Sequence, residues 1–182
     1  MILYDTKYLQ LKKTSSKTGN DWVYAHRPNI TNVVVILPVI NKEETVFLIE
    51  ERPPITAEYG TKKTIGLPAG LVGDIRKNET IKDAIRTELM EETGLKADKI
   101  KILSNCIASS AGCTSETYTI ALAEVNNYKI IEKPIDDGGV IINRVRVKLA
   151  DIDIWLKEQE KNGYILTAQM LSALYYLKEE IK

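Results

Sequence analysis

One segment, residues 67–95 (LPAGLVGDIRKNETIKDAIRTELMEETGL), constrains the fold of this chain more than any other. Its second half predicts an amphipathic helix, because apolar residues recur at the spacing of one helical face. These residues are Ile81, Ile85 and Leu89. Asn78 and Thr80 are both suited to cap the start of the helix, and Asp83 lies at the capping-box spacing from Thr80. Gly94 is suited to end it.

Three glutamates, Glu88, Glu91 and Glu92, lie near the end of this predicted helix. Side chains at i, i+3 and i+4 share one side of a helix, so their like charges repel unless something offsets them. Glu88 and Glu92 border the apolar stripe, whereas a purely solvating charge would lie on the opposite side. A hard divalent cation such as Mg²⁺ takes oxygen ligands and keeps positions open for water and phosphate. We therefore interpret the cluster as a metal site rather than as a solvated acidic face.

The composition narrows the classes of protein and partner. At 182 residues, the chain has the size of one α/β domain with a sizeable core. Its 25 basic and 25 acidic residues cancel, which argues against nucleic acid or an acidic membrane as the main partner. Two cysteines and no signal-like start indicate a cytoplasmic protein, and no apolar run is long enough to span a membrane. The single histidine, His26, argues against a zinc cluster and a Ser-His-Asp triad.

The rest of the chain predicts an α/β (α+β) fold, a mixed β-sheet sandwiched between helices. Residues 8–11 and 22–27 are predicted to pair as an N-terminal hairpin. Residues 33–40 (VVVILPVI) form a mostly continuous apolar run, typical of a strand buried on both faces. Turn residues occur at 126–127 and 136–139. The other predicted strands are 45–50, 101–108, 116–124 and 140–149, and the closing helices are 151–161 and 167–181.

The acidic helix and the loop before it resemble the box of the Nudix hydrolases, G-x5-E-x7-R-E-U-x-E-E-x-G-U, in which U is aliphatic. The corresponding residues are Gly73, Glu79, Thr87, Glu88, Leu89, Glu91, Glu92, Gly94 and Leu95. Thr87 departs from the pattern, because it replaces an arginine that in the family pairs with a carboxylate of the box. Arg86 points about 100° away around the helix and cannot substitute for it. Counting from Gly70 instead of Gly73 gives an alternative start with a longer loop before Glu79.

The resemblance implies a Nudix fold, with residues 1–30 as an N-terminal β segment and residues 31–182 as the hydrolase domain. It also implies pyrophosphatase chemistry with Mg²⁺, or alternatively Mn²⁺, neutralising the phosphate oxygens. Glu88 and Glu92 would be the principal metal ligands. The full set of implied ligands is the backbone carbonyl of Ala69 and the side chains of Glu88, Glu91 and Glu92.

A second motif, residues 110–116 (SAGCTSE), resembles the S-P-G-x-[ST]-x-E loop of the ADP-ribose pyrophosphatases within this family. The last glutamate of that loop is the general base in several members. Glu116 is therefore the leading candidate to deprotonate the attacking water, and Glu91 is the second. Ala111 stands where a proline accompanies preference for ADP-ribose, which weakens that preference here. Cys113 is interpreted as a loop thiol, because no histidine lies near it in sequence.

The N-terminal third adds support for the ADP-sugar subfamily. Trp22 is interpreted either as an aromatic platform for adenine or as an ordinary hairpin aromatic. Arg52 matches an arginine that contacts the pyrophosphate in such enzymes, and a guanidinium suits phosphate. The residues expected to bind substrate are Trp22, Arg27, Arg52 and Leu71. These relatives are domain-swapped dimers, which implies a homodimer in which Trp22 and Arg27 serve the partner's site.

Three hypotheses for function stay open. The first is a Mg²⁺-dependent pyrophosphatase that cleaves ADP-ribose or a related ADP-sugar into AMP and a sugar phosphate. The second is a Nudix hydrolase of another nucleoside diphosphate derivative or of noncanonical nucleoside triphosphates, for which Ala111 leaves room. The third is a non-catalytic nucleotide-binding module, supported only by Thr87.

Overall fold

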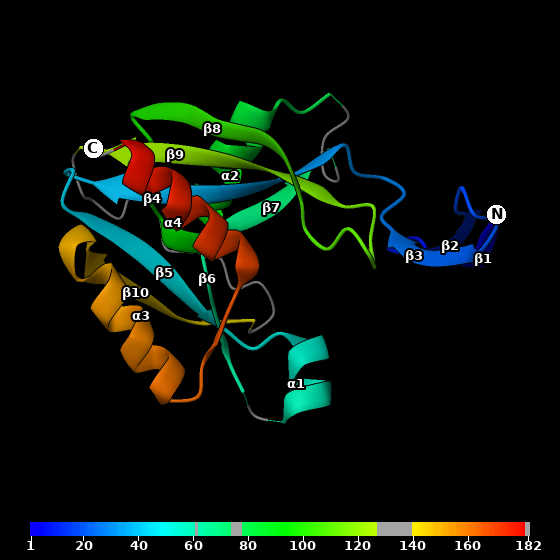
Figure 1. Cartoon of the computed structure of the whole chain (residues 1–182). Helices are drawn as coiled ribbons and strands as arrows, with labels where there is room; N and C mark the ends of the chain where they lie inside the picture. The colour runs from blue at the N-terminus through cyan, green and yellow to red at the C-terminus, as the bar shows by residue number, and fades with distance from the viewer. Residues whose placement is uncertain (61, 74–77, 127–139, 181–182) are drawn as a thin grey trace.

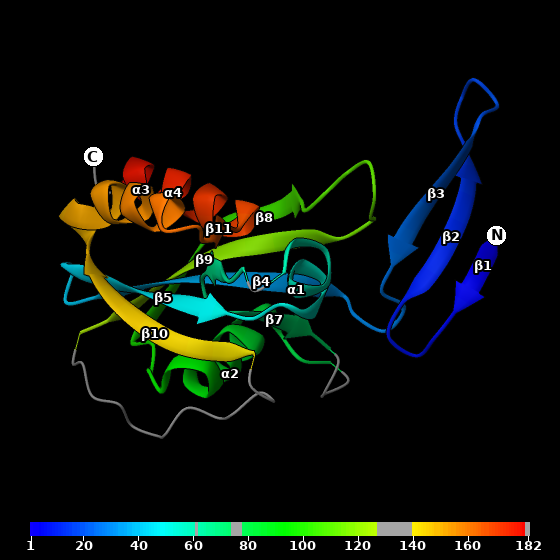
Figure 2. The same ribbon diagram turned by 90° about the horizontal axis from the view of Figure 1, so that it is seen from below.

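The computed structural model describes residues 1–60, 62–73, 78–126 and 140–180 (Figure 1). The predicted turn at 136–139 lies outside the described residues. Within these ranges, the chain forms a main body of sheet and helices and a separate N-terminal sheet that projects from it (Figures 1 and 2). No helix in these ranges is long and apolar enough to cross a membrane.

The main sheet of the described chain is mixed, as predicted. Its strands run in the order β11-β6-β5-β4-β9-β8, with β10 paired to β5 and β7 paired to β4. β4 is parallel to β9 and β6 is parallel to β11, whereas the other pairs are antiparallel. The strands are β4 (Asn32–Ile40), β5 (Glu44–Glu50), β6 (Thr64–Gly66), β7 (Ala69–Val72), β8 (Lys99–Ala108), β9 (Thr117–Val125), β10 (Ile141–Lys148) and β11 (Ile165–Leu166).

β4 lies inside the sheet and accounts for the longest apolar run of the sequence. Every residue from Val34 to Ile40 is buried, as expected for a strand covered on both faces. Pro38 is accommodated in the pairing with β9, in register with Ala123. β4 and β5 pair at Ile40 and Glu44, beside the turn that joins them, and then take different partners. The far ends of the two strands contribute to the cavity described below.

Helices cover both faces of the main sheet, which confirms the predicted sandwich. α2 (Ile81–Thr93) lies on one face, and α3 (Ile152–Lys161) and α4 (Ala168–Glu180) lie on the other (Figure 2). The apolar core is divided in the same way into two clusters. The buried apolar residues of α2 in one cluster are Ala84, Ile85 and Leu89, and those of α3 and α4 in the other include Leu156, Met170 and Leu174.

Among the short elements that are not evident from sequence patterns are α1 (Pro53–Tyr59), β6, β7 and β11. α1 begins with two prolines, which suit the first turn of a helix. It has no buried residue, so it lacks the apolar stripe that would have predicted it. β6, β7 and β11 are too short to show an alternation of apolar and polar residues.

The N-terminal sheet has three strands, β1 (Ile2–Asp5), β2 (Gln10–Ser15) and β3 (Asp21–His26), in that order. The predicted hairpin is present as β2 and β3, with β1 added at its edge. This sheet leaves many large apolar side chains exposed to solvent. They are Ile2, Leu3, Tyr4, Tyr8, Leu9, Leu11, Trp22 and Val23.

Candidate functional site

The start and end of α2 set the position of the three clustered glutamates. The Thr80 side chain accepts a hydrogen bond from the Asp83 amide, so Thr80 rather than Asn78 is the N-cap. Gly94 ends the helix in the left-handed conformation, with φ 72°, and its amide donates to the Met90 carbonyl. The predicted helix boundaries are thus confirmed.

β7 lies against α2 and contacts two of the glutamates. The Ala69 amide donates a 2.9 Å hydrogen bond to Oε2 of Glu92. At Gly70 a Cβ atom would overlap the Glu88 carboxyl group, so this position admits only glycine while Glu88 stays in place. The contact explains why the glycine of the Pro-Ala-Gly element occurs where it does. Gly73, with φ 91°, plays a separate part, because its amide donates to the Glu79 carboxylate over 3.1 Å.

A cavity of about 350 Å³ opens beside β7. Five of the sequence-predicted site residues line it: Arg27, Arg52, Ala69, Leu71 and Glu116. Its other lining residues are Val33, Val35, Glu50, Gly66, Leu67, Gly70, Tyr118, Thr167 and Gln169. The structure therefore brings together a candidate base, two arginines and the strand that contacts Glu88 and Glu92.

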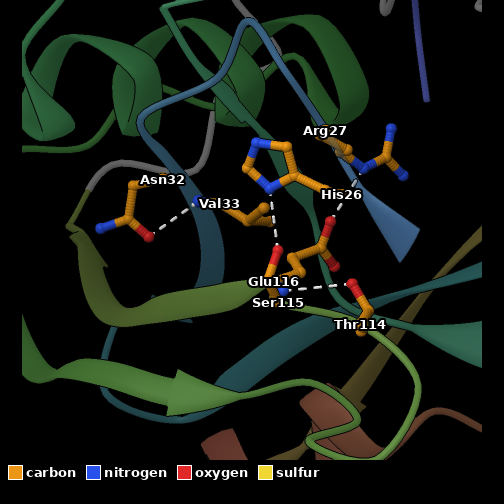
Figure 3. Close-up of polar contacts among 7 residues, drawn as sticks. All are labelled: His26, Arg27, Asn32, Val33, Thr114, Ser115 and Glu116. Carbon is orange, nitrogen blue, oxygen red and sulfur yellow. Dashed lines mark hydrogen bonds and ion pairs between the residues drawn. The ribbon is translucent and has the colours of Figure 1, made fainter. Parts of the chain in front are cut away.

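Arg27 and Glu116, which are far apart in the sequence, form an ion pair at the cavity (Figure 3). Arg27 Nε donates a 2.8 Å hydrogen bond to Oε2 of Glu116. The Glu116 amide in turn donates to Oγ1 of Thr114 over 3.1 Å, which fixes the end of the loop. The candidate base thus has a cationic partner from its own chain.

The end of β3 is bound to the loop that carries Glu116. His26 Nδ1 and Ser115 Oγ lie 2.9 Å apart (Figure 3), and Ala25 exchanges backbone hydrogen bonds with Cys113 and Ser115. Nearer the start of the strand, the Trp22 indole donates to the Gly112 carbonyl over 3.1 Å. Trp22 is half exposed and does not line the cavity, so this contact anchors its edge to the loop.

Glu50, at the end of β5, is a cavity residue that sequence reasoning missed. Its side chain is 2% exposed and forms an ion pair with Arg52, whose guanidinium is more open to solvent. A carboxylate is rarely buried this fully unless it is paired. The only sequence signal for Glu50 is that it ends the apolar strand sequence TVFLIE. A glutamate at an exposed strand end would give the same pattern, so this signal does not predict a buried carboxylate.

The electrostatic environment of Glu92 is unusual. Its burial raises the pKa of the carboxyl group to about 8, although the hydrogen bond from Ala69 acts in the opposite direction. The neighbouring carboxylates of Glu88 and Glu50 raise the pKa further, and Arg52 lowers it. Glu92 is thus a carboxyl group that lacks sufficient positive charge around it.

Some predicted site residues are not brought together. Glu88, Glu91 and Glu92 are partly buried but do not line the cavity. Glu92 and Glu88 approach it through Ala69 and Gly70. Glu92 contacts the Ala69 amide and not its carbonyl. Within the described ranges, no group of three or more His, Cys, Asp or Glu side chains is arranged to hold a metal ion.

Comparison with known proteins places this arrangement in a family. The NUDIX domain model matches residues 30–165, which include the acidic helix, β7 and the Glu116 loop. This chain belongs to the Nudix family.

Individual relatives agree with that placement. The ADP-ribose pyrophosphatases of Escherichia coli strain K12 and of Shigella flexneri are each 34% identical to this Nudix chain over 95 residues. The match spans 52% of this chain but only 44% of each relative's length. A crystal structure of an ADP compounds hydrolase also matches, with a TM-score of 0.69 over 100% of this chain and 90% of the hydrolase chain. Because the two sequences are only 21% identical, this match supports the fold alone.

The contact between Gly70 and Glu88 in this Nudix domain can be tested by Gly70→Ala. The added methyl group must displace the Glu88 carboxyl group, and because this group is the far end of a flexible side chain we expect the free energy of unfolding to fall by less than about 1 kcal/mol. Gly112→Ala is the matched control, because a Cβ at Gly112 meets no atom within 4 Å, and it should leave Glu88 in place. Crystal structures of both variants show the position of the Glu88 carboxyl group. An unmoved Glu88 carboxyl group in Gly70→Ala would contradict the close packing.

The raised pKa of Glu92 predicts a pH dependence of stability in the metal-free protein. Between the ordinary value of 4.5 and about 8, the folded state keeps a proton that the unfolded state releases. The free energy of unfolding should therefore fall as pH rises through this window, by at most about 1.4 kcal/mol per pH unit. Denaturation in a chelator at pH 5 to 8.5 measures the slope. Glu92→Gln should flatten it, whereas the exposed-site control Glu158→Gln should not; an unchanged slope in Glu92→Gln would contradict the assignment.

Proposed function

We propose that this protein is a divalent-metal-dependent hydrolase that cleaves the diphosphate of ADP-ribose or a related ADP-sugar into AMP and a sugar phosphate. The observation that carries the proposal is the position of Ala69 and Gly70. These two residues contact Glu92 and Glu88 on α2 and also line the cavity that holds Arg27, Arg52 and Glu116. A metal on the glutamates would thus lie next to a phosphate in the cavity. The ADP-ribose pyrophosphatases that are 34% identical to this chain over 95 residues support this substrate class.

The residues present fit a hard divalent cation. The pKa of Glu92 is raised because its carboxyl group is buried beside Glu88 and Glu50, and a bound cation would relieve that excess of negative charge. Glu88 and Glu92 would be the principal ligands, with Glu91 and the Ala69 carbonyl as further ones. We propose Mg²⁺ as the natural ion and Mn²⁺ as an alternative. When bound, the ion neutralises the phosphate oxygens and favours attack by water.

The side chains of the cavity would bind the substrate and move the proton. The guanidinium groups of Arg52 and Arg27 are suited to the diphosphate oxygens. The ion pair with Glu50 orients the Arg52 guanidinium group in the cavity. Glu116 would accept the proton of the attacking water, with Glu91 as the second candidate. Because Arg27 and Glu116 form an ion pair before substrate arrives, a phosphate that engages Arg27 would leave Glu116 free to act as a base.

The cavity wall supports a ligand with an apolar face. Val33, Val35, Leu67, Leu71 and Tyr118 line it beside the charged groups. Ligand sites commonly combine an apolar wall with a few polar groups that orient the ligand. Leu71 would thus contact the substrate, as its place in the cavity suggests.

A second candidate is hydrolysis of another nucleoside diphosphate derivative or of noncanonical nucleoside triphosphates. Ala111 favours it, because it replaces the proline that accompanies ADP-ribose preference in similar loops. The chemistry at α2 would be the same. A nucleotide-binding module without catalysis is disfavoured, because such a module has no need of both the acidic helix and Glu116.

The proposed function is tested by a panel of nucleoside diphosphate sugars and nucleoside triphosphates with Mg²⁺, followed by phosphate release after coupling to a phosphatase. We expect turnover of ADP-ribose or a close relative. Glu92→Gln should lower kcat at least about 100-fold, because it removes a metal ligand. Glu116→Gln should also lower kcat about 100-fold or more but leave the Mg²⁺ requirement unchanged.

Glu158→Gln, at an exposed position on α3, is the control and should behave as the wild type. Failure of every nucleotide to turn over with any divalent ion would reject the enzyme, and preference for triphosphates would favour the second candidate. A near-normal rate in Glu92→Gln would reject the metal assignment.

We also propose that the protein is a homodimer and that residues 1–30 form a segment distinct from the domain of residues 31–182. The exposed apolar side chains of the N-terminal sheet support this, because many large apolar side chains left exposed on one small sheet are more easily accounted for by contact with another protein chain. Arg27 lies at the cavity of its own chain, so a role in the partner's site is left to Trp22, as a platform for adenine. The exposed free thiols of Cys106 and Cys113 suit a reducing cytoplasm.

The dimer predicts a solution mass of twice the 20.5 kDa of one chain, measurable by light scattering during gel filtration. Leu11→Glu places a charge on the exposed face of the N-terminal sheet and should shift the protein toward monomer. Ile154→Glu, on the exposed side of α3, is the control and should leave the mass unchanged. A wild-type protein that is monomeric at micromolar concentration would contradict the proposal.

A further inference from the structure

The C-terminal end of α2 carries an unfavourable charge pattern. Glu91 and Glu92 lie in its last turn, which has no basic side chain. The C-terminus of a helix has a partial negative charge, so carboxylates there destabilise it and cations stabilise it. Thr87 adds no positive charge one turn earlier, where an arginine could reach Glu91 at i+4. Beyond the Gly94 cap, the helix supplies no positive charge of its own to stabilise this end.

Arg144, on β10, contacts this end of the helix. Its Nε donates a hydrogen bond to the backbone carbonyl of Glu92. This carbonyl is one of the last four of α2, which have no partner within the helix. Arg144 is partly buried, and no carboxylate in the described part of the chain forms an ion pair with it. Two residues along the same strand, Arg146 instead pairs with Glu44.

β10, which carries Arg144, is fixed in position by its pairing with the main sheet. It pairs with β5 from Ile141 to Lys148, with Arg144 in register with Leu48. Leu48 is fully buried and precedes Glu50 by two residues on the same strand. The strand that ends at the Glu50–Arg52 pair is thus linked through β10 to the main chain of Glu92. Because the guanidinium binds a backbone carbonyl rather than a carboxylate, it can fix the helix end without occupying a metal ligand.

We propose that Arg144 is a positioning residue for the candidate metal site. It holds the last turn of α2 so that Glu88 and Glu92 stay against Ala69 and Gly70, a task that Thr87 cannot perform from within the helix. The inference rests on the proposed function in that it takes these glutamates as metal ligands. Its direct consequence is a higher affinity for divalent cations, which can be measured without any substrate.

The test is the Mn²⁺ dissociation constant of the full chain, measured by electron paramagnetic resonance. Arg144→Ala should raise this constant about tenfold, as loss of a supporting contact commonly does. Arg144→Lys, which keeps the charge and a donor, should raise it less. Arg146→Ala removes the neighbouring ion pair and is the matched control, expected to leave Mn²⁺ affinity unchanged. Thermal unfolding of each variant shows how much stability is lost alongside.

A second arginine provides a rescue that a merely structural role would not produce. Thr87→Arg alone should change Mn²⁺ affinity little, because Arg144 already holds the helix end. In the Arg144→Ala background, Thr87→Arg should recover most of the lost affinity. The two changes would then be non-additive, as expected for residues that serve one purpose. Additive effects, or unchanged affinity in Arg144→Ala, would overturn the proposal.

The outcomes separate this inference from the proposed function. The predicted Mn²⁺ pattern without turnover of any nucleotide would support the role of Arg144 and reject the hydrolase. Normal nucleotide turnover and Mn²⁺ affinity in Arg144→Ala would reject the role of Arg144 and leave the hydrolase standing. If Arg144→Ala fails to fold, Arg144→Met decides, because it keeps an unbranched side chain but has no donor for the Glu92 carbonyl; unchanged Mn²⁺ affinity in that variant overturns the proposal.

Discussion

The packing of α2 against β7 is the contact on which the rest of the site depends. A glycine at position 70 leaves space for the Glu88 carboxyl group, and the neighbouring Ala69 amide binds Glu92. The same two strand residues form part of the cavity wall. Two carboxylates on a helix are thereby held next to a space large enough for a ligand. The buried stripe of α2 supplies the apolar packing that keeps this contact closed.

This packing buries carboxyl groups close together, which is electrostatically unfavourable, and a nearby arginine offsets part of that repulsion. Glu92, Glu88 and Glu50 influence one another, and the pKa of Glu92 rises because its carboxyl group is buried. Arg52, at the N-cap of α1 shortly after β5, offsets part of this charge, and Arg144 binds the helix end from β10. The remaining deficit of positive charge is what a divalent cation would supply. Fold and chemistry are coupled here, since one arginine follows β5 directly and the other lies on β10, the partner strand of β5.

The sequence predicted the local features of this site well and the long-range ones poorly. The caps of α2, its apolar stripe and the buried β4 follow from residue spacing, and the structure has them. Glu116 is proposed as the base through its resemblance to a family motif, whereas its ion pair with Arg27 joins residues 89 positions apart, which spacing cannot reveal. Glu50 and Arg144 were missed for the same reason. A charged residue on a strand is usually exposed, and only the packing of neighbouring strands shows that these two are not.

The central claim is that Glu88 and Glu92 together hold a divalent ion beside the cavity. A crystal structure of the protein with Mn²⁺ and a non-hydrolysable ADP-ribose analogue, recorded with anomalous scattering from manganese, tests it most directly. We predict an anomalous peak within bonding distance of both carboxylates, with the diphosphate in the cavity between Arg52 and Glu116. Manganese bound elsewhere, or an analogue in the cavity with no anomalous peak within bonding distance of Glu88 and Glu92, would contradict the account.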